Sequence, residues 1–124
     1  MGLLRSQLVN GPAAPLHVHT LEDEAWIVEN GEIEYEFTTA AVDGDVARDT
    51  VEAVVVGPAD FVFVPRGYAH AMTVLSETAV VWTMVVPGGL EDFLLDRDEA
   101  DPAKRTGAGV DLEGFGITIY PASE

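Results

Sequence analysis

Residues 11–31 read GPAAPLHVHTLEDEAWIVENG, a stretch that places two histidines and a glutamate just ahead of a run of strand-forming residues. In a β-strand the side chains of residues i and i+2 point to the same side, so His17 and His19 can both reach one ion. Glu24 stands directly before the apolar run 25–28, and it lies within reach of the same ion if the chain bends there. The stretch therefore predicts a strand that gathers metal-ligating side chains on one face.

The third histidine, His70, follows the turn Pro65-Arg66-Gly67 and stands at the start of another predicted strand. The chain has no cysteine, which excludes disulfides, thiolate catalysis and cysteine-bound zinc or iron–sulfur sites. Any metal must therefore be held by histidines and carboxylates. Three neutral imidazoles and one carboxylate suit a divalent transition metal and leave coordination positions open for water, oxygen or substrate.

Strand signals dominate the rest of the chain. Asn30-Gly31 lies between two apolar runs and predicts a β-hairpin, since a type I′ turn needs a positive φ at both positions. In its second strand Ile33, Tyr35 and Phe37 alternate with glutamates, which indicates one buried face. The predicted strands span residues 25–29, 32–37, 50–56, 61–64, 69–75 and 80–86, followed by a short helix over 90–100 and a last strand or packed extended tail over 116–120. Short strands separated by turn residues predict a sandwich or a barrel.

The composition describes one acidic domain. The 124 residues carry 6 Lys+Arg against 22 Asp+Glu, a formal net charge of −16. Such a surface repels phosphates, so we expect no nucleic-acid partner and no anionic membrane partner. No apolar run approaches the roughly 20 residues that a membrane-spanning helix needs. Residues 1–15 lack the apolar block of a signal peptide, so we expect a cytoplasmic protein.

Two motifs of the chain resemble those of the cupin superfamily over their full length. The first, G-x5-H-x-H-x4-E-x6-G, is matched over residues 11–31 at every defined position, namely Gly11, His17, His19, Glu24 and Gly31.

The second motif, G-x5-P-x-G-x2-H-x3-N, covers residues 59–74 and is matched at Pro65, Gly67 and His70. Ala59 replaces its glycine, a mild change if this turn residue has a negative φ. Val74 replaces its asparagine, and because His70, Met72 and Val74 share a strand face, this wall of the pocket is expected to be apolar.

The resemblance implies an all-β fold, a single cupin jelly roll (double-stranded β-helix barrel) over residues 1–124 with a short C-terminal helix. It also implies one divalent transition metal per chain (Fe, Mn, Ni, Co, Cu or Zn). The implied ligands are His17, His19, Glu24 and His70. The side chains that we expect to line the substrate pocket, from their strand positions, are Trp26, Tyr35, Phe63, Met72 and Val74.

Residues 87–93 resemble the stretch that follows the core in small cupins similar to quercetin dioxygenases. That resemblance implies a metal-dependent dioxygenase acting on an enolizable or aromatic small molecule, with Glu24 as a catalytic base when it detaches from the metal. Two alternatives stay open: an oxygen-independent isomerase or cyclase, and a ligand-binding or sensing cupin with a structural metal. The resemblance further implies a homodimer, for which the strand over 80–86 and Leu3, Leu4 and Leu8 offer apolar surface.

Overall fold

The computed structural model describes residues 1–87 and 117–120. Within these residues the chain forms one seven-stranded sheet and a short 3-10 helix. The elements are β1 (Gly2–His19), β2 (Asp23–Asn30), β3 (Ile33–Thr38), η1 (Arg48–Thr50), β4 (Val51–Val56), β5 (Phe61–Val64), β6 (Ala69–Val86) and β7 (Ile117–Ile119). The helix predicted over 90–100 lies outside the described residues. Across the described ranges, no helix has the length and hydropathy needed to cross a membrane.

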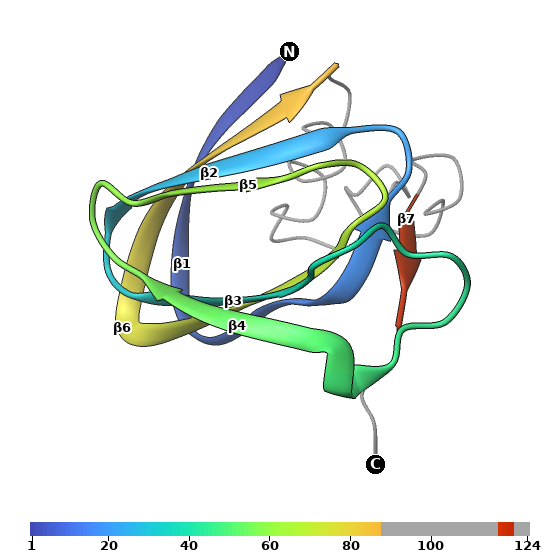
Figure 1. Ribbon diagram of the computed structural model, residues 1–124. Coiled ribbons are helices and arrows are strands. Elements are labelled where there is room, and N and C mark those ends of the chain that lie inside the picture. The colour runs from blue at the N-terminus through green and yellow to red at the C-terminus, as the bar shows by residue number, and fades with distance from the viewer. Residues whose placement is uncertain (88–116, 121–124) are drawn as a thin grey trace, which may run out of the picture.

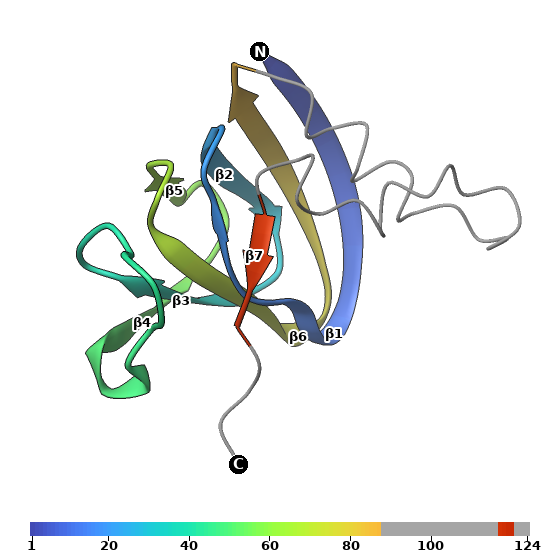
Figure 2. The same ribbon diagram turned by 90° about the vertical axis from the view of Figure 1, so that its right-hand side faces the viewer.

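Two long strands hold the sheet together. β1 and β6 are each 18 residues long and pair antiparallel along most of their length. Residues 80–86 of β6 pair with β2, which also pairs with β5, whereas residues 70–74 pair with β3, which also pairs with β4. β7 pairs with the end of β1. The sheet thus curls into two wings that face each other, β5-β2 and β4-β3, joined by β6 and β1 (Figures 1 and 2).

The hairpin prediction at Asn30-Gly31 is wrong. β2 and β3 do not pair with each other, because both pair with β6, one beyond the other. The chain therefore turns a corner and continues alongside β6. Gly31 has a φ of 93°, but Asn30 does not have the positive φ that a type I′ turn requires.

Gly31 sits where this corner touches β6. A Cβ placed on Gly31 would lie 2.6 Å from the carbonyl oxygen of Thr78 and 2.7 Å from the Cβ of Ala79. The two strands predicted over 69–75 and 80–86 are parts of one continuous strand, β6, which runs past this corner without interruption.

Only the end of β1, around His17 and His19, was predicted from the sequence, although the residues before it alternate as they do in a strand. Leu4, Ser6 and Leu8 are half-buried and alternate with the exposed Leu3 and Arg5, which is the period of a strand with one covered face. The predicted strands over 50–56, 61–64 and 116–120 are confirmed as β4, β5 and β7.

The main hydrophobic core lies between the two wings. Its buried members are Trp26, Val28, Ile33, Tyr35, Val56, Val64, Val74, Ala79 and Val81. A second cluster, Leu16, Val18, Ala69 and Ala71, lies on the opposite face of β1 and β6 and is covered by Val42, Val46, Val51 and Tyr120. Because strand side chains alternate between faces, the residues next to this second cluster point into the space between the wings.

Ala59 adopts a φ of 72°, the only positive φ of a non-glycine residue in the described part of the chain. The condition under which its replacement of glycine would be mild is therefore not met. The conformation is held by hydrogen bonds that join this turn to β2, from Ala59 N to the Val28 carbonyl (2.8 Å) and from Val28 N to the Asp60 carbonyl (3.1 Å).

Candidate metal centre

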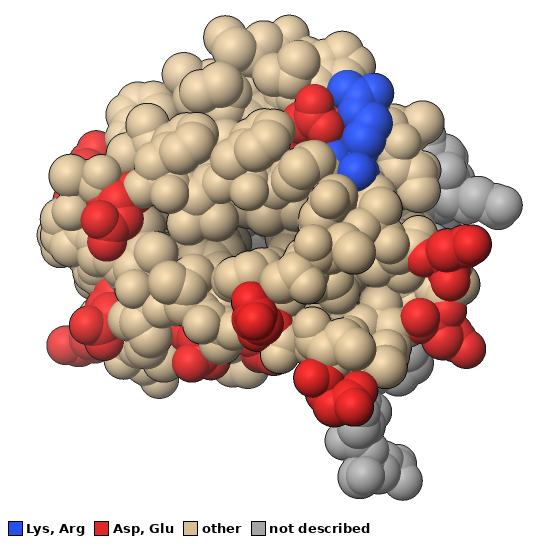
Figure 3. Space-filling model, viewed as in Figure 1, with Lys and Arg blue, Asp and Glu red and all other residues tan. Residues whose placement is uncertain are grey.

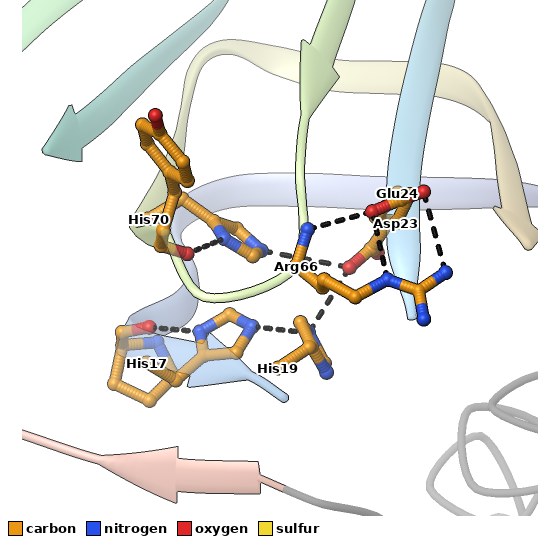
Figure 4. A network of polar contacts seen from close by, with 8 residues as sticks. His17, His19, Asp23, Glu24, Arg66 and His70 are labelled. Carbon is orange, nitrogen blue, oxygen red and sulfur yellow. Dashed lines mark hydrogen bonds and ion pairs between the residues drawn. The ribbon is translucent and has the colours of Figure 1, made fainter. Parts of the chain in front are cut away.

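Three strands bring four potential metal ligands to one point (Figure 4). His17 and His19 come from the end of β1, Glu24 from the start of β2 and His70 from the start of β6. One ligand atom of each residue lies within 4.8 Å of the others. The arrangement predicted from the sequence is therefore present in the fold, and Glu24 reaches the histidines because the chain turns between His19 and Asp23.

The spacing of the ligand atoms fits a single ion. His17 Nε2 lies 3.0 Å from His19 Nε2, and Glu24 Oε2 lies 3.0 Å from His19 Nε2 and 3.5 Å from His70 Nε2. Two ligand atoms that are each about 2.1 Å from one ion and at right angles to each other are about 3 Å apart. Two imidazole lone pairs at this distance repel each other unless a cation or a proton lies between them. The donor set thus fits a divalent transition metal.

Backbone carbonyls orient two of the imidazoles. His17 Nδ1 lies 2.6 Å from the Pro15 carbonyl oxygen, and His70 Nδ1 lies 3.4 Å from that of Tyr68. Since a carbonyl only accepts hydrogen bonds, each Nδ1 carries the proton and each Nε2 presents its lone pair to the centre. These two partners could not be predicted from the sequence, because every residue supplies a backbone carbonyl.

The turn of the second motif is also tied to the centre. Gly67 N donates a hydrogen bond to the carbonyl of His19 (2.7 Å). Arg66 pairs with Asp23, the neighbour of Glu24, at 3.2 Å from its Nε (Figure 4). These contacts fix the starts of β2 and β6 against the end of β1, so the four ligands share one rigid frame.

Electrostatics keep His17 and Glu24 in their metal-binding protonation states. Burial and the neighbouring His70 and His19 lower the pKa of His17 to about 3. Burial alone would raise the pKa of Glu24, but its contact with the imidazole of His19 outweighs burial and lowers the pKa to about 2. At neutral pH His17 is thus neutral and Glu24 ionised, the forms that bind a metal.

Unsatisfied polar atoms make the centre a candidate binding site. Glu24 Oε2, His70 Nε2 and His19 Nδ1 are buried and make no regular hydrogen bond with any described residue. Buried polar atoms normally have a hydrogen-bond partner, so a cluster of three buried atoms without one needs an explanation. A ligand at the centre would supply the partner for the first two.

Four of the five predicted pocket residues lie on the inner face. Trp26 is buried, with its ring centroid 5.1 Å from that of His70 and 5.0 Å from that of Tyr35. Val74 is buried opposite Ile33, and the half-buried Met72 lies opposite Tyr35. The wall beside His70 is therefore apolar, as the valine in the second motif indicated. Figure 3 shows the surface hollowed between β5 and β3, toward this inner face.

Phe63 does not belong to the pocket, and its prediction was wrong. Its side chain is 55% exposed and lies opposite Ala25 on the outer face of the β2–β5 wing. Val62 and Val64, which alternate with Phe61 and Phe63 along β5, point inward; Val64 is buried in the core. Side chains alternate along β5, so either Phe61 and Phe63 or Val62 and Val64 can face Trp26, but not both pairs.

Comparisons with known proteins agree with the fold. No family model matches the chain, and a search of curated proteins found no match. Among solved structures it resembles KdgF from Halomonas sp. (TM-score 0.58, 18% identity, 72% of this chain and 70% of that chain). It also resembles an uncharacterized conserved protein with a double-stranded β-helix domain from Klebsiella pneumoniae (TM-score 0.55, 19% identity, 70% and 63%).

A third similar structure is that of CoII HppE in complex with Tris buffer (TM-score 0.51, 18% identity). The match covers 67% of this chain but only 43% of HppE, so the chain spans less than half of that protein. At these identities the likeness concerns the fold. Together with the curled antiparallel sheet and its two facing wings, it identifies the architecture of this chain as the double-stranded β-helix, the cupin fold.

Proposed function

We propose that the protein is a metal-dependent dioxygenase that acts on an enolizable or aromatic small molecule. The observation that carries the proposal is the convergence of three imidazole nitrogens and one carboxylate oxygen within 4.8 Å, next to a buried apolar wall. The CoII form of HppE, a structure with a similar fold, is consistent with a metal in this architecture.

A bound divalent transition metal would supply Lewis-acid and one-electron redox chemistry at this point. The three histidines hold it without adding charge, and Glu24 contributes a single negative charge. The centre then keeps a charge of about +1, which favours a substrate that binds through an anionic oxygen. Glu24 is the carboxylate at the centre, and we assign it the role of accepting the proton of an enol when it moves away from the metal.

The surrounding side chains favour a flat, apolar substrate. Trp26 and Val74 are buried beside the centre and offer an aromatic face and a branched aliphatic surface. A sugar or a phosphate would need several hydrogen-bond donors, whereas the described inner wall offers few polar groups. An aromatic or enolizable compound meets both conditions, because it carries an acidic oxygen on a planar skeleton.

Metal analysis tests the site directly. Protein purified without a polyhistidine tag should bind about one transition metal per chain, and His70→Ala should lose most of it. Glu24→Gln should also weaken binding, whereas Glu34→Gln, the same change on the outer face of β3, should leave the metal content unchanged. If wild type holds no transition metal and none can be loaded, the assignment of the site is wrong.

Oxygen uptake tests the reaction. Metal-loaded protein should consume O2 when supplied with members of a panel of flavonols and acid-reductones. Conversion of a compound without O2 uptake would refute the dioxygenase and favour an isomerase or cyclase. A metal that responds to no small ligand and supports no turnover would favour a sensing protein with a structural metal.

We also propose that the protein forms a homodimer through the outer face of β5-β2-β6-β1. Register places two rows of side chains across this face, Phe63–Ala25–Met84–Leu3 and Phe61–Ile27–Trp82–Arg5. Phe61 is 58% exposed and Leu3 is 55% exposed. Contiguous exposed apolar surface of this kind is typical of interfaces.

Charge favours a second copy on this face. Arg5 pairs with Glu29 (2.7 Å) and Arg66 with Asp23 (3.2 Å), so the two acids of β2 on this face are neutralised. Elsewhere acids predominate, and Figure 3 shows them gathered over β3 and β4 and sparse over β2 and β5. Light scattering at moderate salt should give a dimer mass, and Phe61→Lys should give a monomer. Val55→Lys, on the exposed surface of β4, should not; a monomeric wild type would refute the proposal.

A further inference from the structure

Tyr35 lies deep on the inner wall next to the metal centre. Its side chain is 1% exposed and belongs to the core cluster. It lies opposite Met72 on β6, two residues from His70, and its ring packs against Trp26 at a centroid distance of 5.0 Å. The Trp26 ring also lies 5.1 Å from the ring of His70, so the indole packs between Tyr35 and the metal centre.

The hydroxyl of Tyr35 has no explanation in the folded structure. Its oxygen is buried and makes no hydrogen bond with any residue in 1–87 or 117–120. The core cluster to which Tyr35 belongs is made mostly of aliphatic side chains such as Ile33, Val64 and Val74. A buried tyrosine hydroxyl normally finds a partner, and phenylalanine would fill the same space without leaving a polar group unpaired.

The state of the hydroxyl suits a donor. Burial and the negative charge of Glu24 raise the pKa of Tyr35 above its usual value. The phenol thus keeps its proton at all ordinary pH values. It can donate one hydrogen bond to an oxygen that enters the space between the wings.

We propose that Tyr35 is a specificity-determining residue that donates a hydrogen bond to a second oxygen of the compound bound at the metal centre. The inference rests on the proposed function of this centre and narrows its substrate class. The substrate is a planar compound with at least two oxygens a few bonds apart, as in a hydroxyketone or an enediol. One oxygen is placed at the centre and the other accepts from Tyr35, which orients the ring against Trp26.

The test compares two probes on the Co(II)-loaded protein, followed by the visible absorption of cobalt. Maltol has two oxygens on adjacent ring carbons, whereas azide binds a metal through one terminal nitrogen and contains no oxygen. Tyr35→Phe should weaken maltol binding about tenfold, or about 1.4 kcal/mol, and leave azide and cobalt affinities unchanged. Tyr68→Phe, which removes the hydroxyl of a half-buried tyrosine at the edge of the same cluster, should leave both probes unaffected.

The melting temperature of the metal-free protein distinguishes a role in substrate binding from a structural role of the Tyr35 hydroxyl. Tyr35→Phe should unfold at the same temperature as wild type or a few degrees higher, because it removes an unpaired buried hydroxyl. A fall of several degrees would show that the hydroxyl has a structural partner and would overturn the proposal. Equal maltol affinity in wild type and Tyr35→Phe would overturn it while leaving the metal centre intact. Failure of wild type to bind cobalt would refute the proposed function itself, and this inference with it.

Discussion

Replacing Gly31 with alanine should destabilise the protein strongly. Gly31 has a φ of 93°, and a non-glycine residue in the left-handed region costs roughly 1–2 kcal/mol. The added Cβ would also lie 2.6 Å from the Thr78 carbonyl oxygen and 2.8 Å from the Ala79 Cα. Both are backbone atoms of β6, which cannot move aside as a flexible side chain would. Overpacking of this kind costs about 1–3 kcal/mol.

The two costs combine to a loss of about 2–4 kcal/mol, after allowing up to about 1 kcal/mol for the lower entropy of an unfolded chain with alanine. At about 4 °C per kcal/mol for a domain of this size, the melting temperature should fall by about 10 °C. Urea unfolding followed by tryptophan fluorescence measures the free energy, and circular dichroism measures the melting temperature.

Gly44→Ala is the matched control. Gly44 has a φ of 85°, close to that of Gly31, but a Cβ there would meet nothing within 4 Å. Its substitution should cost only about 1 kcal/mol, the conformational part. If the two variants lose the same free energy, the close approach of the corner to β6 is not what requires glycine at position 31, and the reasoning fails.

Three further predictions concern the turn before β5, acid and salt. Ala59→Gly should raise the free energy of unfolding by about 0.5–1 kcal/mol in a urea titration, because it relieves a φ of 72°; an unchanged or lower value would contradict this. The folded pKa of His17 (about 3) lies below its ordinary value of 6.5, and that of Glu24 (about 2) lies below its ordinary value of 4.5, so the unfolded state takes up more protons as the pH falls. The melting temperature of the metal-free protein should therefore fall as the pH drops from 6.5 toward 3, and a flat profile would show that these groups titrate normally. Because the net charge is −16, stability should rise from low to moderate salt as repulsion is screened, and a midpoint that stays level or falls would show that the acids are already compensated.

Local sequence patterns predicted the residues of the candidate site better than they predicted how the strands connect and pair. The period of two along a strand placed His17 beside His19, and it also put His70 on one face with Met72 and Val74. These relations depend only on residues that are close in the chain. The spacing of the two motifs then supplied Glu24 and the cupin fold.

Strand pairing was beyond the same rules at the Asn30-Gly31 corner. A glycine with a positive φ is compatible both with a hairpin turn and with a bend between two strands that do not pair. The dipeptide therefore does not show whether β2 and β3 pair with each other. The answer depends on β6, whose 18 residues run past both strands and offer each of them an edge. A partner some forty residues away in the chain cannot be read from a local pattern.

Side-chain chemistry and short-range periodicity were enough to predict the strand-rich architecture, the types of metal ligand and the acidic composition from the amino-acid sequence. The folded structure was needed to show which side of β5 faces the core: Val64 is buried there, whereas Phe63 is exposed on the outer face. It alone also showed that carbonyls orient His17 and His70, and that the hydroxyl of Tyr35 is buried without a partner. Burial, hydrogen-bond satisfaction and close backbone approach are relations between distant segments of the chain, so they exist only once the sheet has curled.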